Sequence, residues 1–370
     1  MARKKRLHYK DLDAMRFLAF VPVFLYCAMY LMASEDNPFI QDMSVLMGFV
    51  KQNSMDFFFF LSAFLLTSHA LRELKYHKSF GFKAFYTRRA IRILPVLIIA
   101  ILFAFILHPY IVKVLAFEPI TTPNIFKFFV YPPSDIPELS KEQYIYLAVI
   151  WTIYMFIQFY IFWGIILKFF LQQIKYVSII LIGIGIASRT FHVLIDTSIE
   201  FDILSAGIPI GIGGLVAHIF RNDERTIEMI KHLPKGTHLV AYLIGIASII
   251  CGYIFLGNTY AAAIVPLVTC TFFAYLVAEQ TYAKESLFKL RKRRLLSRLG
   301  RISYGLIVYQ SIFTVIGIIA VDSLDLNLGS IPIQFGYLII SFIITWITAD
   351  VSYNIFERPF YNIRKEFKRS

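Results

Sequence analysis

The chain has 370 residues, of which 58% are hydrophobic and only 16% are charged. A soluble domain has about half apolar and a quarter charged residues, so this composition excludes an ordinary soluble protein and predicts one that spans a membrane. The net charge of +13 does not indicate nucleic-acid binding, because the basic residues are spread over several loops and attraction to anionic lipid headgroups accounts for them.

The apolar stretches along the chain predict its architecture. A transmembrane helix needs about 20 apolar residues, and lipid cannot satisfy the backbone polar groups of irregular segments. Ten such stretches follow one another, so we expect an all-α polytopic membrane protein with a single domain over residues 1–370. The predicted spans are 14–33, 54–71, 93–112, 144–167, 176–197, 203–219, 237–256, 260–278, 303–321 and 333–353.

The distribution of Lys and Arg predicts the orientation of these spans. With the N-terminus in the cytoplasm, 31 of the 37 Lys and Arg residues fall in cytoplasmic segments and four fall in external loops. Cytoplasmic loops carry the excess of positive charge in membrane proteins. We therefore expect an integral protein of the plasma (inner) membrane, with membrane lipids as partners. Both termini and the loops 72–92 and 284–301 are predicted to be cytoplasmic.

Charged side chains near the spans are candidate functional residues, because burying a charge in lipid is costly. Asp13 and Arg16 are one helical turn apart, so they can form an ion pair. Arg89 and Arg92 share a helix face next to Arg88, and guanidinium groups suit phosphate. These arginines either hold a phosphorylated ligand or anchor the protein to lipid headgroups.

Two further observations concern buried residues. Arg189 falls within the span 176–197, where an internal ion pair is the simplest explanation for it. The three cysteines show no metal-ligand spacing, so no metal site is predicted. Cys251 and Cys270 are expected to pack as small apolar side chains. Cys27 lies eleven residues after Arg16, about three turns along the same helix face.

Several short motifs follow one another in the chain. They are LDAMR at 12–16, DFFFFLSAFLLT at 56–67, FYTRRAIRILP at 85–95, WT to QFY across 151–160, LGRISYGL at 299–306 and ERPF at 357–360. In these motifs, spread over roughly residues 8–362, the chain resembles the acyltransferase family 3 proteins. That resemblance implies a ten-helix bundle that O-acylates envelope polysaccharides with an acyl group from cytoplasmic acyl-CoA. It also implies donor or anion binding by Arg88, Arg89, Arg92 and Ser62.

Three positions depart from the family pattern that the chain resembles. Cys27 stands where the family has a histidine on the first span, Phe156 replaces a carboxylate, and Gln310 replaces a second histidine. Acyl transfer to a hydroxyl needs a base, and neither Phe nor Gln can serve as one. We therefore interpret the protein as a pseudoenzyme, a binding, scaffold or membrane-complex subunit in an envelope process that requires no cofactor. It is expected not to transfer acetyl from acetyl-CoA.

Two alternatives remain open. The protein is an active membrane O-acyltransferase that moves an acyl group from acyl-CoA to an envelope glycan or lipid. Cys27 is then the nucleophile, with Arg16 and Asp13 as the other candidate catalytic residues, or a histidine elsewhere in the chain is the base. The weaker alternative is a channel or carrier. The partners predicted are other proteins of a membrane complex, or the glycan or lipid if the chain is active, and no nucleic acid.

Overall fold

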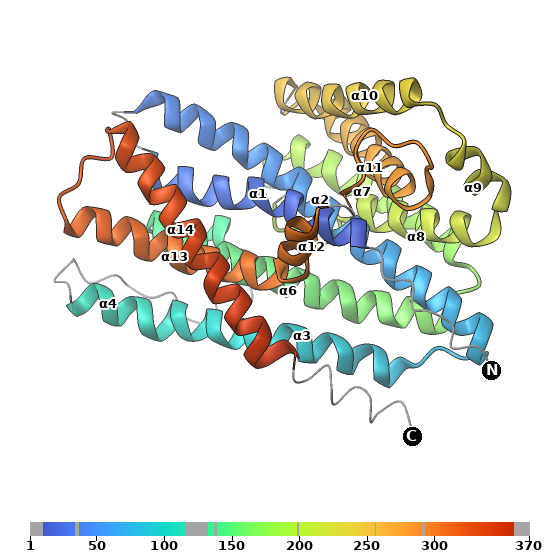
Figure 1. Cartoon of the computed structure of the whole chain (residues 1–370), viewed down its shortest axis with the longest axis horizontal. Helices are drawn as coiled ribbons and strands as arrows, with labels where there is room; N and C mark the ends of the chain where they lie inside the picture. The colour runs from blue at the N-terminus through green and yellow to red at the C-terminus, as the bar shows by residue number, and fades with distance from the viewer. Residues whose placement is uncertain are drawn as a thin grey trace.

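The computed structural model describes residues 10–33, 37–114, 132–136, 139–197, 200–255, 257–290 and 293–358. All regular structure in these residues is helical, which confirms the all-α prediction (Figure 1). The α-helices are α1 Lys10–Met32, α2 Pro38–His77, α3 Phe82–Leu102, α4 His108–Val114, α6 Lys141–Phe169, α7 Ile174–Leu194, α8 Gly207–Asn222, α9 Glu224–Lys231, α10 Lys235–Ile254, α11 Thr259–Tyr282, α12 Arg294–Arg301, α13 Ser303–Ser323 and α14 Ile331–Ser352. Short π-helical or 3-10 segments occupy Phe103–Leu107, Pro133–Asp135 and Tyr353–Glu357.

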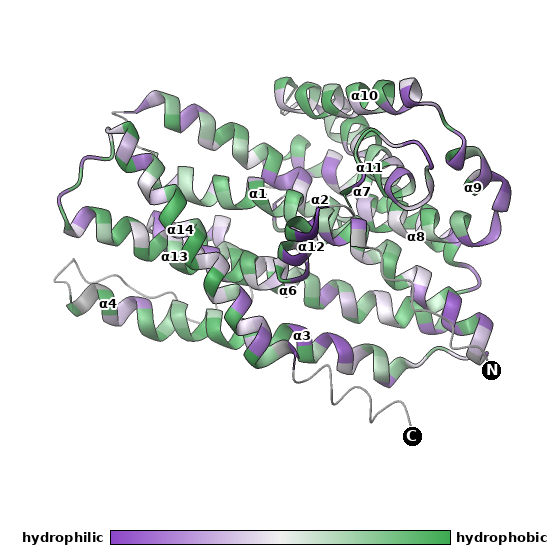
Figure 2. Cartoon of the chain, viewed as in Figure 1, coloured by the Kyte–Doolittle hydropathy of each residue, from purple (hydrophilic) through white to green (hydrophobic). Residues whose placement is uncertain are grey.

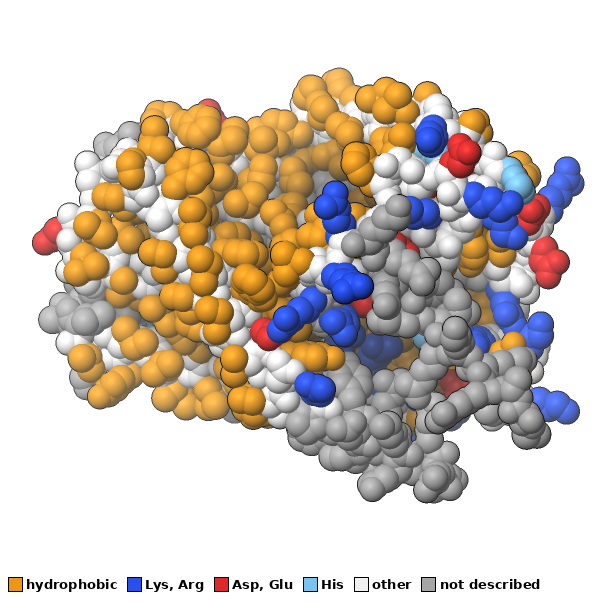
Figure 3. Space-filling view, viewed as in Figure 1, with side chains coloured by type: hydrophobic (Ala, Val, Ile, Leu, Met, Phe, Trp, Pro, Cys, Tyr) orange, Lys and Arg blue, Asp and Glu red, His pale blue; other side chains and the backbone are white. Residues whose placement is uncertain are grey.

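Nine helices of the described residues are long and apolar enough to cross a membrane, so the chain is an integral membrane protein. The long helices are green along most of their length in Figure 2, whereas α9 and α12 are largely purple. Figure 3 shows that the Lys and Arg side chains of this face lie from its middle to its right-hand end, and its left part is mostly apolar. We call the end at the turn between α2 and α3 (residues 77–82), where α9 also lies, the basic end. Residues 359–370, and with them part of the ERPF motif, and both chain termini lie outside the described residues.

Helix α2 is longer than the span predicted within it. It has 40 residues and therefore extends for about 60 Å, twice the thickness of the hydrocarbon core. Pro38 occupies its first turn, and the Asn37 side chain accepts a hydrogen bond from the backbone N–H of Ile40. At the other end Lys78 adopts a left-handed conformation that closes the helix. The residues before position 54 therefore continue the helix.

The predicted span 203–219 corresponds to α8, which has only 16 residues and begins at Gly207. Its glycines allow backbone contact with two neighbours. A Cβ at Gly213 would lie 2.4 Å from the Phe60 carbonyl oxygen of α2, and one at Gly211 would lie 2.5 Å from the Ser178 carbonyl oxygen of α7. Residues 200–206 lie before this helix. Ser205 in this segment is buried, and its carbonyl oxygen accepts a hydrogen bond from Arg189 Nε of α7.

The short helix α12 packs against the start of α1. A Cβ at Gly300 would lie only 1.6 Å from the Asp13 carbonyl oxygen, so no larger residue fits without moving one of the two helices. This contact brings Arg301, the next residue, to the part of the bundle that holds Asp13 and Arg16.

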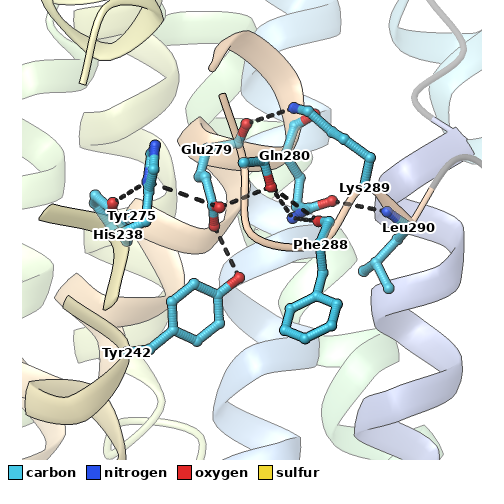
Figure 4. Close-up of polar contacts among 9 residues, drawn as sticks. His238, Tyr242, Tyr275, Glu279, Gln280, Phe288, Lys289 and Leu290 are labelled. Carbon is cyan, nitrogen blue, oxygen red and sulfur yellow. Dashed lines mark hydrogen bonds and ion pairs between the residues drawn. The ribbon is translucent and has the colours of Figure 1, made fainter. Parts of the chain in front are cut away.

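A partly buried polar network holds the segment before α12 against α10 and α11 (Figure 4). Glu279 of α11 accepts hydrogen bonds from the Tyr242 hydroxyl at 2.8 Å and the Ser286 hydroxyl at 2.8 Å. The Gln280 amide donates to the Phe288 carbonyl at 2.6 Å, and Lys289 donates to the Glu279 carbonyl at 3.0 Å. These bonds fix the linker that leads to Arg301.

Candidate functional site

A cavity of about 490 Å³ lies towards the basic end, between α1, α2, α3, α6, α12 and α13. Four of the residues that line it are arginines, and one is a carboxylate, so its walls carry an excess of positive charge. We call it the arginine cavity. It is lined by Leu12, Asp13, Arg16, Phe58, Ser62, Leu65, Leu66, His69, Arg89, Arg92, Ile93, Phe156, Tyr160, Arg301, Ser303, Tyr304, Ile307 and Tyr353.

The structure defines the contacts of two arginines in the arginine cavity, Arg16 and Arg89. Arg16 forms the expected ion pair with Asp13, with 2.9 Å between its Nη1 and the carboxylate Oδ1. Arg89 lies over the Tyr160 ring at 5.3 Å and near the Phe85 ring at 5.8 Å. Its Nε is buried and has no hydrogen-bond partner among the described residues. A buried guanidinium N–H of this kind is suited to an anionic ligand.

Most of the predicted donor-binding residues line this cavity, and Arg88 does not. Arg88 is next to Arg89 in the helix, so its side chain is rotated by about 100° and it interacts with Glu73 instead. Two basic lining residues, Arg301 and His69, were not among the predicted donor-binding residues. Arg301 belongs to the LGRISYGL motif and could have been found there, whereas nothing in the local pattern around His69 indicates its place.

A second, smaller cavity of about 40 Å³ lies on the other side of the bundle centre, away from the basic end. We call it the polar cavity. Its volume accommodates about three water molecules. It is lined by Val23, Tyr26, Cys27, Lys51, Gln52, Met55, Asp56, Phe59, Ile145, Ala148, Val149, Thr152, Met155, Arg189, Glu200, Asp202, Ser205, Ala206 and Ile307.

Several of the charged side chains that line the polar cavity form ion pairs with one another. Arg189 Nη2 lies 2.6 Å and 2.8 Å from the two carboxylate oxygens of Asp56, and its Nε donates to the Ser205 carbonyl at 3.0 Å. The prediction of an internal ion pair for Arg189 is therefore confirmed. Lys51 Nζ lies 2.6 Å from Glu200 Oε1 and 3.8 Å from the centre of the Tyr26 ring.

Asp202 lies between α7 and α8 and is held by donors on all sides. Its carboxylate accepts hydrogen bonds from the hydroxyls of Ser188 and Ser205 and from the backbone N–H groups of Leu204 and Ser205. Burial raises the pKa of Asp202, but these hydrogen bonds outweigh it and the net pKa is below the ordinary value. Asp202 is therefore ionised at neutral pH and has little tendency to take up a proton.

One apolar layer separates the two cavities. On α2, Phe58 lines the arginine cavity and Phe59 lines the polar cavity, and on α6 the same division falls between Phe156 and Met155. The Phe59 and Phe156 rings stack with their centres 4.3 Å apart. Ile307 of α13 borders both cavities. Phe156, which stands at the carboxylate position of the resemblance, is thus part of the layer.

Cys27 lines the polar cavity, whereas Arg16 and Asp13 line the arginine cavity. The eleven residues between Arg16 and Cys27 span about 16 Å along α1, which carries Cys27 past the apolar layer. Its thiol is 3% exposed, and its Sγ accepts a hydrogen bond from Gln310 Nε2 at 3.2 Å. The Gln310 amide oxygen is buried without a partner among the described residues. Two of the three departing positions are therefore in direct contact.

Comparison with known proteins identifies the family of the chain. The model of the acyltransferase 3 family, described as an acyltransferase domain, matches residues 9–350. The chain belongs to this family. A peptidoglycan O-acetyltransferase of Listeria monocytogenes is 22% identical over 412 residues, which cover 99% of this chain and 58% of that protein.

Two further relatives come from Staphylococcus aureus strains COL and MSSA476, and each is named as a putative O-acetyltransferase. Each is 22% identical over 393 residues, which cover 98% of this chain and 58% of the relative. The chain thus spans 58% of the length of these relatives. No solved structure matches it. The relatives' names do not support the pseudoenzyme interpretation, and they favour the active acyltransferase at least as strongly.

Proposed function

We propose that the protein is a membrane O-acyltransferase that takes an acyl group from acyl-CoA in the arginine cavity and passes it to a hydroxyl of an envelope glycan or lipid. The observation that carries the proposal is the pair of cavities, one basic and one polar, on either side of a single apolar layer. Family membership and the names of the relatives support the reaction type.

The arginine cavity fits the phosphate groups of coenzyme A. Among the described residues, four arginines and the carboxylate of Asp13 line it, and guanidinium groups bind phosphate oxygens through paired N–H groups. The unpartnered Nε of Arg89 supplies a donor for it. Coenzyme A occurs in the cytoplasm, so the proposal requires the basic end to face the cytoplasm, as the positive-inside rule also predicts.

Cys27 is proposed to carry the acyl group between the two cavities. Its thiolate attacks the thioester carbonyl carbon of the donor, a new carbon–sulfur bond forms, and coenzyme A leaves as a thiolate that takes up the proton of the cysteine. The Gln310 amide donates to Sγ at 3.2 Å, and its second N–H is the proposed donor to the thioester oxygen as negative charge develops there. Phe59 and Phe156 have to part for the donor to reach the sulfur.

A second candidate function is a binding protein that holds the same anionic donor without transferring its acyl group. The stacked rings of Phe59 and Phe156 and the 3% exposure of Cys27 favour it, because both keep the sulfur away from the arginine cavity. The two candidates share the donor site and differ in whether the layer opens.

Release of coenzyme A from radiolabelled acetyl-CoA tests the proposal. The full chain in detergent, with an envelope glycan extract as acceptor, is expected to release coenzyme A and label the extract, and Cys27→Ala should reduce both to background. Turnover that survives Cys27→Ala would contradict the cysteine relay. Donor binding without turnover by the natural chain would contradict transfer and favour the binding protein.

A further inference from the structure

The end of α7 holds a chain of three polar side chains beside the polar cavity. His192 Nδ1 lies 2.7 Å from the Thr197 hydroxyl, and His192 Nε2 lies 3.3 Å from Asp202 Oδ2. Asp202 lines the polar cavity, and so does Arg189, which is three residues before His192 on the same face of α7. Thr197 is exposed. The three side chains therefore connect the polar cavity with the surface away from the basic end.

The turn that ends α7 brings Thr197 back to His192. The backbone N–H of Thr197 donates to the His192 carbonyl at 3.0 Å, and that of Asp196 donates to the Val193 carbonyl at 3.4 Å. Asp196 has a φ of 52°, a left-handed conformation that Asp adopts more readily than most residues. These backbone bonds close the turn by themselves, so the turn does not depend on the Thr197 hydroxyl.

The charge of Asp202 determines which nitrogen of His192 is the acceptor. Asp202 is ionised, so it favours the tautomer with the proton on the adjacent Nε2. Nδ1 then accepts a hydrogen bond from the Thr197 hydroxyl. The side chain of threonine is a secondary alcohol, as are most ring hydroxyls of a sugar. The contact therefore has the geometry that a base needs with the hydroxyl of an acceptor.

We propose that His192 is the base that takes the proton of the acceptor hydroxyl, with Asp202 as its positioning residue and Thr197 in the place that the acceptor hydroxyl occupies. This inference rests on the proposed acyltransferase function and assigns its base. The ligand class is a sugar hydroxyl that approaches from the surface away from the basic end. It can replace the Thr197 hydroxyl without opening the bundle, because Thr197 is exposed.

Other contacts between histidines and carboxylates in the described residues are not accessible to such an acceptor. His232 Nε2 lies 3.1 Å from Glu228 in α9, at the basic end. His238 Nδ1 lies 3.7 Å from Glu279, and its side chain is 0% exposed. The side chain of His192 is 21% exposed and lies at the opposite end of the molecule. His192 therefore combines a carboxylate partner with access for an acceptor.

The proposed step balances. The acceptor oxygen attacks the carbonyl carbon of the acyl-Cys27 thioester while its proton moves to His192 Nδ1, and the ring becomes an imidazolium beside Asp202. The carbon–sulfur bond then breaks, and its electron pair stays on the sulfur as a thiolate. The imidazolium returns its proton to this thiolate, and the acyl group remains on the acceptor as an ester. Removing such a base typically slows transfer by about 10² to 10⁴.

A partition experiment tests the role of His192. The full chain in detergent is given acetyl-CoA together with methyl glucoside, a probe with secondary hydroxyls, or with hydroxylamine, which discharges a thioester without needing a base. His192→Gln is expected to keep the first burst of coenzyme A and the turnover with hydroxylamine but to lose at least about 100-fold in transfer to methyl glucoside. Added imidazole should restore transfer to His192→Ala. His218→Gln is the matched control, because His218 contacts Asn222 within α8, and it should behave as the natural chain.

Two further variants separate catalysis from a structural role. Thr197→Val removes the hydroxyl and keeps the shape of the side chain, so transfer to methyl glucoside should equal or exceed that of the natural chain. A loss as large as that of His192→Gln would show that the bond between the two residues is structural and would overturn the proposal. Asp202→Asn should lower the kcat of transfer and leave the KM for methyl glucoside unchanged, and the reverse would overturn its positioning role.

The remaining outcomes distinguish this inference from the function on which it rests. Transfer to methyl glucoside at the natural rate by His192→Gln would overturn the assignment of the base. A burst in the natural chain without any transfer to methyl glucoside would overturn the acceptor site at His192. Absence of a burst in the natural chain would instead overturn the acyltransferase function itself.

Discussion

Individual residues of the arginine cavity differ in how directly they face it. Arg89 and Arg92 line the cavity, whereas Arg88 lies on the same helix but outside the lining. All three carry the same charge and follow one another within a single turn and a half of α3. A comparison of these three residues therefore separates direct contact with the ligand from the general effect of positive charge.

Substitution of the lining arginines should weaken donor binding. Arg89→Gln and Arg92→Gln are each expected to raise the Kd for coenzyme A by about 10- to 100-fold, since a hydrogen bond to a charged group contributes about 1.5–3 kcal/mol. Arg88→Gln removes the same charge outside the lining and should change the Kd by less than about threefold. Isothermal titration in detergent gives all three values. An equal loss in all three variants would mean that net charge, and not this cavity, determines binding.

The buried pair of Arg189 and Asp56 gives a second prediction at this scale. Asp56→Asn leaves Arg189 buried without its counter-charge and should lower the free energy of unfolding by about 3–5 kcal/mol. Arg189→Met/Asp56→Leu removes both charges and should lower it much less. Unfolding in mixed micelles measures both. If the double variant is less stable than Asp56→Asn, the ion pair stabilises the fold by more than the neutralisation of one buried charge by the other.

The sequence predicts local pairs and misses distant ones. Asp13 and Arg16 are three positions apart on one helix, so helical geometry was sufficient to pair them. Asp56 and Arg189 are 133 positions apart, and spacing indicates that Arg189 needs a partner but not which one. The placement of Cys27 beyond the apolar layer also depends on how α2 and α6 pack against α1. The sequence gives the identities of these residues, and only the packing decides which cavity each one lines.

Single elements of the bundle follow from the apolar pattern, apart from their ends. Apolar stretches locate the membrane helices because only a helix satisfies the backbone in lipid. The predicted bounds of a helix are wrong where its ends do not coincide with those of the apolar stretch. Helix α2 begins at Pro38, outside the apolar stretch, and α8 begins only at Gly207. The contact of α12 with α1 depends on one glycine, and a hydropathy pattern contains no information about it.

Gly300→Ala should disrupt that contact. The added methyl would lie 1.6 Å from the Asp13 carbonyl oxygen, so α12 has to move away from α1. The expected loss in the free energy of unfolding is at least about 3 kcal/mol, the upper part of the usual range for overpacking, together with weaker coenzyme A binding. Gly336→Ala in α14 is the control, because a Cβ there meets nothing within 4 Å, and it should be neutral or stabilising by up to about 1 kcal/mol. Similar thermal melting of both variants would show that α12 is not held at Gly300.

At the scale of the whole molecule, the face shown in Figure 3 is basic towards one end and mostly apolar towards the other, and this asymmetry agrees with the predicted orientation. The Lys and Arg side chains gather on one side of the face shown in Figure 3. The arginine cavity lies towards the same end. A cytoplasmic donor can reach this cavity only if the basic end faces the cytoplasm, so the two predictions stand or fall together. The two cavities and the layer between them could not be predicted from the sequence, because α1, α2, α6 and α13 together form them.

Labelling of single cysteines tests the orientation. Leu287→Cys lies between α11 and α12 and should resist an impermeant maleimide added to intact cells, whereas Leu326→Cys, between α13 and α14, should react. Both leucines are at least 36% exposed in the structure, so a difference in labelling reports the side of the membrane. The opposite pattern would reverse the topology and remove cytoplasmic acyl-CoA as the donor.

Detection of an acyl group on Cys27 is the most direct test of the account, because it requires the donor site, the opening of the layer and the nucleophile together. The natural chain is mixed with acetyl-CoA without acceptor, quenched in acid, digested and examined by mass spectrometry. The account predicts one acetyl group on the Cys27 peptide, released by neutral hydroxylamine, and none on the peptides of Cys251 or Cys270. Coenzyme A release that leaves Cys27 unmodified, or an acetyl group found on another residue, would contradict it.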